Sequence, residues 1–488
     1  MIKNYLKIAW RNVSTLKFYS VLNISGLALA ISCCMLIYLY TSYNLSFDSY
    51  HKHSKNIFRL VYELHLQKTE YDKGSSFREL IEVKKLPQVQ QAAFAVDNQS
   101  LIVNVNGDVK KRFKEEGTVA FTDASWFKLF SFQWLAGNAA QLNQPGNAVL
   151  RQTTGRKYFG NANPIGQILT INNRQIKVVG VIADAPYNTD IRSDIYLSLT
   201  SIPIMPLYDN GFFTNWGYLS SKQSGFIVLN NANQKEAVER QLLEIETTQG
   251  GKDMARYFKF KLLPLNQIHF DTRYGGVVQK PLLLNLVIVG ILIIAIAIFN
   301  YINLTIAQQT KRAAEVATRK VLGGSARQIF MQFITESLVT SVLAVVAAVI
   351  LVLLILPVAN TWLFIDVPVY IISYTYLYLF AGIVLLCITV GTGVYPALLL
   401  SRISIAQVLK NNVLSFPAGV GRKVMVVFQN TVTQGLIVCT IIIMLQVHFL
   451  KNTDIGFNRK AVITIPIGQI SASQKEQFNE ALKQIPAV

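Results

Sequence analysis

Metal chemistry is the first possibility that the side chains raise. His51 and His53 stand in the H-x-H spacing that can bind a metal ion, and His65 follows nearby. No cysteine and no second histidine group completes a site around them, so we expect neither a metal nor another cofactor. The cysteines lie inside apolar runs, where they pack as small apolar side chains and build no disulfide framework. They are Cys33, Cys34, Cys387 and Cys439.

A second group of reactive side chains is a charged segment, residues 300–336, between two long apolar runs. Residues 313–322 can form a helix in which Glu315 and Arg319 stand at i and i+4 in the favourable acid-first order. Gly323 then ends this helix, since glycine readily takes the left-handed conformation of a C-cap. The charged residues of the segment are Lys311, Arg312, Glu315, Arg319, Lys320 and Arg327, with Glu336 at the edge of the next run.

The residues after this stop predict the start of another helix. Ser325 and Gln328 have the spacing of a capping box, which would begin the helix that enters the following apolar run. Spacing alone leaves two interpretations open. One is a short helix outside the membrane against which another protein pushes. The other is a basic loop that only sets topology and touches lipid headgroups.

The chain contains no motif for energy conversion or catalysis. Gly250-Gly251-Lys252 is followed by Asp253 and so fails the nucleotide-binding pattern G-x-x-x-x-G-K-[ST]. No G-x-S-x-G, H-E-x-x-H or kinase signature occurs either. We therefore expect this chain not to be an enzyme. A membrane-anchored hydrolase would need a catalytic cluster in the polar part of the sequence, and the sequence offers none.

Composition places these residues in a membrane protein. Hydrophobic residues make up 51% of the chain and charged residues only 15%, and the apolar residues are clustered in runs. A formal net charge of +19 would suit a nucleic-acid-binding protein, but much of the excess lies in short segments beside the apolar runs. Positive charge at such places sets membrane orientation. We expect contact with a lipid bilayer and none with nucleic acid.

Five apolar runs are long enough to cross a bilayer and predict transmembrane helices. They cover residues 19–43, 281–306, 332–356, 373–400 and 424–448. The positive-inside rule gives one alternating topology. The basic N-terminus (1–18), the 307–331 segment and the 401–423 linker are cytoplasmic, whereas residues 44–280, the 357–372 loop and residues 449–488 lie outside. No run carries a charge in mid-membrane, which disfavours an ion-coupled transporter.

The large outer region, residues 44–280, predicts a soluble domain of mixed α/β type. Strand patterns occur at 58–62 and 177–181, and residues 234–247 have helical spacing with Glu and Lys expected at the surface. The segments 11–62 and 422–466 repeat each other weakly. We therefore expect residues 449–488 to begin a second outer domain, and the sequence to be a truncated part of a longer duplicated chain.

Several short motifs, each weak alone, follow one another in an informative order. They are Trp10-Arg11-Asn12, Ser46-Phe47-Asp48 with Ile57-Phe58-Arg59, Asn163-Pro164-Ile165-Gly166, Asn300-Tyr301-Ile302-Asn303 leading to Arg319-Lys320-Val321-Leu322-Gly323, and Tyr395-Pro396-Ala397. In this arrangement the chain resembles the FtsX-like permeases of ABC transporters, in particular the duplicated MacB-type permeases of Bacteroidetes-like bacteria. The sequence departs from the family pattern at Ala317-Thr318, Ile405 and Asn430, on the surface expected to meet a partner.

The resemblance implies a fold and a mechanism. The outer domain would be periplasmic, with a porter-like part and an inserted β-rich part, on a protein of the bacterial inner membrane. A separate cytoplasmic ATPase would push the coupling helix, with Glu315, Arg319 and Lys320 making the contacts and Gly323 setting the helix stop. Efflux is the function expected first, with a periplasmic adaptor and an outer-membrane channel as further partners. Lipoprotein release, regulation of cell-wall hydrolases and a membrane receptor with an outer sensing domain are the alternatives.

Overall fold

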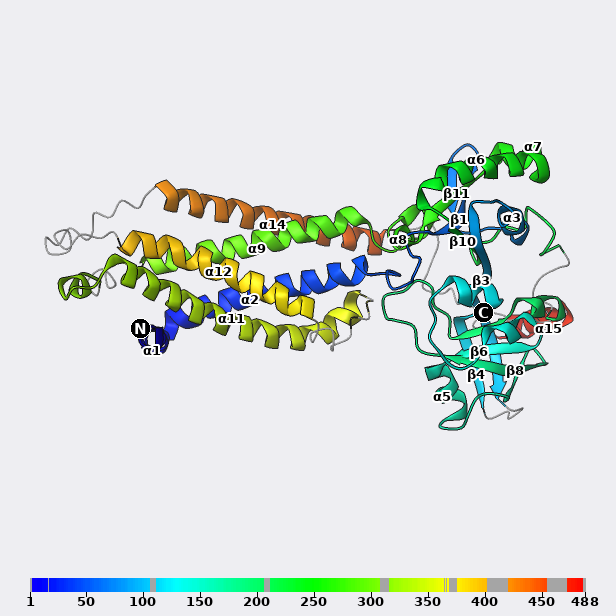
Figure 1. Ribbon diagram of the computed structural model, residues 1–488, viewed down its shortest axis with the longest axis horizontal. Coiled ribbons are helices and arrows are strands. Elements are labelled where there is room, and N and C mark those ends of the chain that lie inside the picture. The colour runs from blue at the N-terminus through cyan, green and yellow to red at the C-terminus, as the bar shows by residue number, and fades with distance from the viewer. Residues whose placement is uncertain are drawn as a thin grey trace.

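The computed structural model describes residues 2–15, 17–105, 111–205, 211–307, 316–363, 365, 367, 375–401, 420–453 and 472–485. The molecule is elongated, with a bundle of long helices at one end and a sheet domain at the other (Figure 1). This arrangement confirms the predicted fold class, since five helices have the length and apolar composition to cross a membrane. They are α2 (Lys17–Leu45), α9 (Lys280–Ala307), α11 (Ala326–Leu363), α12 (Thr375–Ser401) and α14 (Val420–Asn452).

Helices α2 and α11 pack together at the centre of the bundle. Leu27 and Ile31 of α2 lie in one buried cluster with Ala344 and Ala348 of α11, both fully buried. Small side chains such as these alanines let two helix backbones approach closely in a membrane. The fifth candidate span, α14, packs along α9, where the Asn303 amide donates to Gln429 Oε1 at 3.5 Å.

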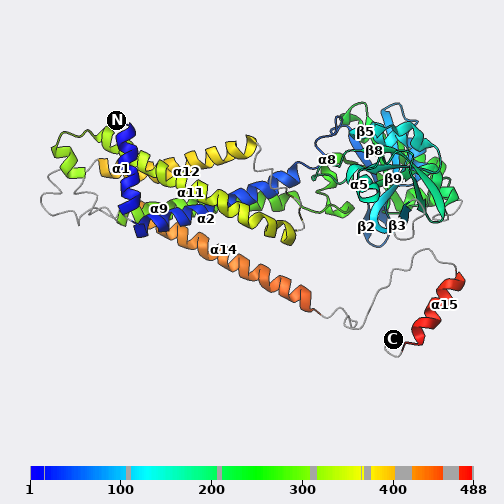
Figure 2. The ribbon, with the colours of Figure 1, turned by 90° about the horizontal axis from the view of Figure 1, so that it is seen from below.

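A short helix, α1 (Ile2–Thr15), lies across the end of the bundle far from the sheet domain (Figure 2). It packs on α11 and buries Ala9 against the bundle. The other side of α1 exposes Trp10 at 61% together with Lys7 and Arg11. Apolar and basic side chains on one exposed helix face are typical of a helix that lies in a membrane interface.

The sheet domain contains an 11-stranded mixed sheet in the order β11-β1-β10-β3-β4-β9-β6-β8-β5, with β2 beside β1 and β7 beside β3 and β8. Most pairs are antiparallel, but β4 with β9 and β6 with β8 are parallel. The strands are β1 (Ile57–His65), β2 (Thr69–Asp72), β3 (Val89–Val105), β4 (Arg112–Thr122), β5 (Trp134–Gly137), β6 (Asn147–Arg151), β7 (Ile168–Ile171), β8 (Arg174–Ile182), β9 (Ile195–Ser198), β10 (Gln223–Leu229) and β11 (Phe258–Pro264). The predicted strands at 58–62 and 177–181 are thus present as parts of β1 and β8.

The long strand β3 explains how both faces of the sheet are buried. Successive side chains of a strand point to opposite faces. Ala92, Phe94 and Val96 therefore enter one core, and Ala93 and Ala95 enter the other. The helices that cover the sheet are α3 (Phe77–Val83), α4 (Ala124–Leu129), α5 (Gln152–Phe159), α6 (Lys235–Ile245), α7 (Lys252–Tyr257) and α8 (Leu265–Ile268).

The chain divides this domain into two lobes that share β3. The root lobe (β1, β10 and β11 with α3 and α6) carries both chain connections to the bundle, from α2 into β1 and from β11 through α8 into α9. The inserted lobe (residues 112–198, β4 to β9) lies between β3 and β10 in the chain. A further helix, α15 (Ala472–Lys483), follows the bundle in sequence.

One expectation about the domain surface is wrong. The predicted helix over 234–247 is present as α6 and the π-helical turn Glu246–Gly250 that continues it, but Glu246 is only 1% exposed. The turn directs this carboxylate at β11, where the backbone N–H of Phe260 donates to Glu246 Oε1 at 3.3 Å. Helical spacing marks the buried face by its apolar residues and gave no sign of an acidic one.

Candidate functional site

The charged segment between α9 and α11 lies at the end of the bundle far from the sheet domain (Figure 1). Residues 316–321 are helical, and three of the four predicted coupling residues, Arg319, Lys320 and Gly323, are in the described part. Glu315, with Lys311 and Arg312, lies outside the described residues. The predicted pair between Glu315 and Arg319 is therefore still a prediction.

The predicted helix stop is present. Gly323 has a φ of 90°, in the left-handed region. Its N–H donates to the Lys320 carbonyl at 3.1 Å, and the Gly324 N–H donates to the Arg319 carbonyl at 2.9 Å. These two bonds form the Schellman motif, which satisfies carbonyl groups that the helix end would leave unpaired. A Cβ on Gly324 would come within 2.9 Å of the Arg319 carbonyl oxygen, so this position also favours glycine.

The predicted capping box follows directly. The Gln328 N–H donates to Ser325 Oγ at 3.3 Å, and the Ser325 N–H donates to Gln328 Oε1 at 3.0 Å. Helix α11 begins at Ala326. A helix stop and a helix start within a few residues fix a sharp corner, because both sets of end groups are satisfied locally.

Arg319 ties this corner to α11. Its guanidinium donates to Gln332 Oε1, and Gln332 is a buried side chain on the first turns of α11. Arg319, Leu322 and Gly324 also line a cavity of about 320 Å³ that Tyr5 of α1 and Gln332 complete. Arg319 is therefore half-buried and holds the corner, whereas Lys320 stands at its partly exposed edge.

Sequence reasoning missed an apolar tip on the same corner. Val321 is 65% exposed and Leu322 is 81% exposed, just before the glycine stop. An apolar pair rimmed by cations, on a rigid turn outside the spans, is suited to contact with another protein. The available signal was the position of two large apolar residues between Lys320 and Gly323, in a segment too polar to lie in the membrane.

The rigidity of this corner can be tested without any partner. Replacing Gly323 by alanine places a Cβ in the left-handed region and costs about 1–2 kcal/mol. We expect roughly 5- to 30-fold faster hydrogen exchange at amides 322–324 in nanodiscs. Gly382→Ala in α12 is the matched control, since no heavy atom lies within 4 Å of its added carbon. Equal exchange in both variants would mean that the glycine stop does not hold the corner.

The three histidines are used within the fold. His65 contacts Glu63 at 3.1 Å, and Nδ1 of buried His51 accepts from the Ser131 N–H at 3.1 Å. Among the described residues, no three His, Cys, Asp or Glu side chains are placed to hold a metal ion.

Comparison with known proteins gives similar permeases. The chain is 21% identical over 282 residues to the macrolide export ATP-binding/permease protein MacB of Salmonella paratyphi A, covering 55% of this chain and 39% of the relative. It is 26% identical over 212 residues to the pyoverdine export ATP-binding/permease protein PvdT of Pseudomonas syringae pv. tomato, covering 42% of this chain and 29% of that protein. The chain thus spans about two fifths or less of the length of these relatives.

Among solved structures, a domain of a permease protein from Porphyromonas gingivalis is 18% identical, with a TM-score of 0.38, and covers 44% of this chain and 91% of that chain. The periplasmic region of MacB from Actinobacillus actinomycetemcomitans is 16% identical, with a TM-score of 0.32, and covers 44% of this chain and 90% of that chain.

Two family models match most of the chain between them. The MacB-like periplasmic core domain matches residues 20–245, which contain α2 and most of the sheet domain. The FtsX-like permease C-terminal model matches residues 287–405, which contain the charged segment and α11. With its membrane helices, the protein is an inner-membrane protein with a periplasmic domain. The chain belongs to the FtsX/MacB-type family of ABC transporter permeases.

Proposed function

We propose that this permease passes an ATP-driven conformational change from a cytoplasmic ATPase to its periplasmic domain, in the service of export. The observation that carries the proposal is the corner at residues 316–328. It is capped on both sides, it exposes Val321 and Leu322, and it lies at the end of the bundle opposite the periplasmic domain. A rigid, partly apolar turn at that place is what a soluble ATPase needs in order to push on the membrane helices.

The orientation of the chain in the membrane supports this placement. With the domain in the periplasm, an odd number of crossings by α2 puts α1 in the cytoplasm, and α9 returns the chain to the same side. The exposed cations of α1, Lys3, Lys7 and Arg11, agree with the positive-inside rule. The side chain of Trp10 would then lie among the lipid headgroups of the inner leaflet, so that α1 supports the corner from the membrane surface.

Each coupling residue takes a role in this proposal. Lys320 and Glu315 contact the ATPase surface directly, and Val321 and Leu322 insert between its side chains. Arg319 contacts the ATPase with the outer part of its side chain and keeps the corner on α11 through Gln332. Gly323 permits the turn.

We place the ATPase on a separate subunit, since the 488 residues contain no nucleotide-binding motif. The export relatives carry both functions in their names, as ATP-binding/permease proteins. Their names also support efflux as the work done, with a periplasmic adaptor and an outer-membrane channel as further partners. The test is co-purification of the permease with an ATPase encoded beside it, and hydrolysis measured in nanodiscs. We expect the permease to stimulate hydrolysis, and absence of both binding and stimulation would overturn the proposal in favour of a receptor.

The apolar tip gives a sharper test of the contact. In Leu322→Asp an exposed leucine becomes charged, so the fold loses nothing while the interface loses one buried side chain, worth about 1.5–3 kcal/mol. We expect the affinity for the ATPase to fall about 10- to 100-fold. Leu66→Asp, at a 58% exposed leucine between β1 and β2, is the matched control and should leave affinity unchanged. If both variants bind equally well, Leu322 lies outside the interface.

A further inference from the structure

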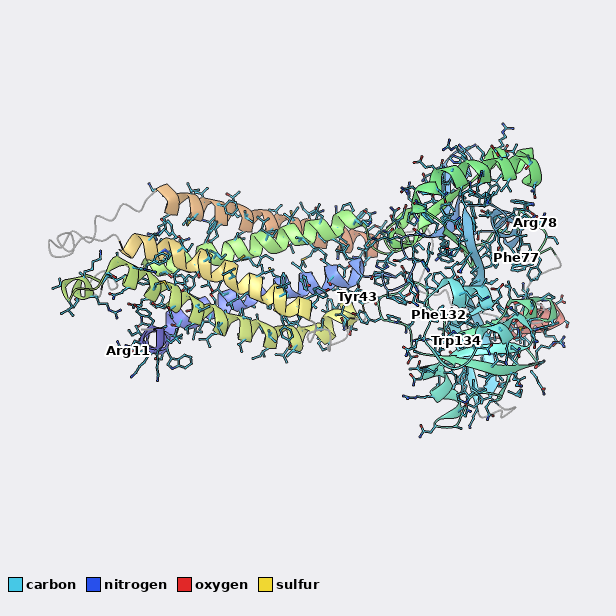
Figure 3. All side chains as sticks on the ribbon, in the orientation of Figure 1. Arg11, Tyr43, Phe77, Arg78, Phe132 and Trp134 are labelled. Carbon is cyan, nitrogen blue, oxygen red and sulfur yellow. The ribbon has the colours of Figure 1, made fainter. Side chains whose placement is uncertain are left out.

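The membrane helices and the periplasmic domain meet in a neck at the ends of α2 and α8 (Figure 3, where Tyr43 is labelled). Three pieces of chain far apart in sequence come together there. They are residues 43–51 at and after the end of α2, residues 187–190 in the loop between β8 and β9, and His269 just after α8. We call these three pieces the neck joint.

Asp48 is the centre of the contact between α2 and the loop. It is 1% exposed and has a φ of 53°, in the left-handed region. One carboxylate oxygen accepts from the Thr189 hydroxyl, and the other accepts from the Asp190 N–H at 3.2 Å. The Asp48 N–H itself donates to the Asn188 carbonyl at 3.1 Å. Three consecutive loop residues are thus held by one side chain and its backbone.

Two more contacts repeat this attachment closer to the membrane. The Asn188 amide donates to the Ser46 carbonyl at 3.0 Å and to Ser46 Oγ at 2.8 Å. The ring of Tyr187 stacks on Tyr43 of α2, with centroids 5.9 Å apart.

His269 brings the start of α9 into the same joint. Its Nε2 lies 2.9 Å from Asn44 Oδ1, and its Nδ1 lies 3.1 Å from Asp190 Oδ2. The Asn44 amide nitrogen already donates to the Tyr40 carbonyl, so both neighbours of the imidazole are acceptors. Only a ring with a proton on each nitrogen donates to both at once. The ring also stacks on Phe47, with centroids 3.6 Å apart.

The loop passes this attachment on to the inserted lobe. Arg151, at the end of β6, is a buried side chain that holds both ends of the loop. Its guanidinium lies 2.6 Å from Asp194 and 3.4 Å from Asp184. A second link runs past the loop, since Nδ1 of His51 accepts from the Ser131 N–H at 3.1 Å and the Lys52 N–H donates to Ser131 Oγ at 3.0 Å.

We propose that Asp48 and His269 are positioning residues that fix the inserted lobe to α2 and α9, so that a movement of these spans reaches this lobe directly. This role rests on the proposed function, because the movement that it passes on comes from the ATPase. The physical reason is that Asp48 and His269 are buried and multiply hydrogen-bonded. Sliding α2 past the loop would leave a buried carboxylate unpaired, which is far more costly than moving the lobe along.

The test is a distance measurement by spin labels in the full chain, in nanodiscs and with the co-purified ATPase. The labels are attached at Leu135→Cys in the inserted lobe and Leu284→Cys in the first turn of α9, both exposed positions, after replacement of the four native cysteines. We expect a narrow distance distribution that shifts when ATP is added. In Asp48→Ala and in His269→Phe, which keeps the stacked ring, we expect at least a twofold broader distribution and loss of more than half of the shift.

The control and the readouts separate the two proposals. Asp271→Asn changes a carboxylate at the same level that pairs only with its neighbour Arg273, and it should leave the distribution narrow. ATPase binding and stimulation should persist in Asp48→Ala and His269→Phe. A distribution as narrow as that of the wild type in both variants would overturn the joint. A narrow wild-type distribution that ATP does not shift would overturn the proposed function, while broadening in the variants would still support the joint.

Discussion

Reversing the charges at Arg319 and Lys320 is expected to abolish stimulation of the partner ATPase. In Arg319→Glu/Lys320→Glu, two cations at the edge of the exposed tip become carboxylates. Opposed charges in close contact across an interface contribute about 1.5–7 kcal/mol each, and like charges are repelled. We therefore expect at least a tenfold loss of affinity, and loss of detectable stimulation at ordinary protein concentrations. Co-purification and ATP hydrolysis in nanodiscs are the measurements.

The two positions should contribute differently. Arg319 donates to Gln332 Oε1, so its loss both removes a charge and loosens the corner from α11. Lys320 stands at the partly exposed edge, and its loss should act on the interface alone. Arg319→Glu should therefore also speed hydrogen exchange in residues 319–332, while Lys320→Glu should not.

Lys423→Glu provides the matched control. Lys423 is an exposed cation in the first turn of α14, on the side of the membrane that we assign to the cytoplasm. Its reversal changes the charge of that membrane face by the same amount per residue without touching the corner. If this variant loses stimulation as completely as the double reversal, net surface charge is responsible and no specific contact exists. If the double reversal leaves both binding and stimulation intact, the role of the corner is wrong.

Sequence could predict the features that depend on neighbours in the chain. A bilayer demands a long apolar run, so the five spans could be predicted from composition alone. The double stop at Gly323 and Gly324 and the capping box at Ser325 involve residues only a few positions apart, and their chemistry is visible in the sequence. The family resemblance added what these local signals lacked, namely the reason why a basic corner should meet an ATPase.

Features that depend on distant contacts could not be predicted in the same way. The bond from Arg319 to Gln332 exists only because the corner folds the chain back on α11. Asp48 and Thr189 are 141 residues apart, and nothing in either neighbourhood indicates the other. The exposure of Leu322 follows from where α11 starts, and a leucine in a membrane protein is ordinarily assigned to the membrane. Glu246 belongs to the same class, because an acidic residue in a polar helix is normally exposed.

Burial of Glu246 is expected to make the periplasmic domain less stable as pH rises. Burial raises the pKa of Glu246 from its usual 4.5 to about 7, against smaller opposite effects of the Phe260 N–H and Lys261. Its Oε2 has no hydrogen-bond partner among the described residues. Burial also raises the pKa of Glu79 well above its usual value, and the nearby charge of Glu246 adds to that shift.

The sign follows from which state binds the proton more tightly. The folded state holds the proton on Glu246 up to about pH 7, whereas the unfolded chain releases it near 4.5. Its contribution to stability is therefore fully present below about pH 4.5 and is lost as pH rises towards 7 and just beyond. One pKa unit corresponds to 1.36 kcal/mol, so the loss amounts to about 3 kcal/mol. Removing the charge of Glu246 should also relieve Glu79.

Glu246→Gln tests this directly, because glutamine keeps an acceptor for the Phe260 N–H and cannot ionise. Unfolding of the full chain in detergent, followed by the fluorescence of Trp126 and Trp134 between pH 4.5 and 8, gives the two profiles. We expect the variant to exceed the wild type in stability at pH 8, with the difference shrinking as pH falls. Glu244→Gln, an exposed glutamate of the same helix, should follow the wild type throughout. Parallel profiles for wild type and Glu246→Gln would show that the buried carboxylate is compensated, and that the helix turn can hold its charge at no cost to the fold.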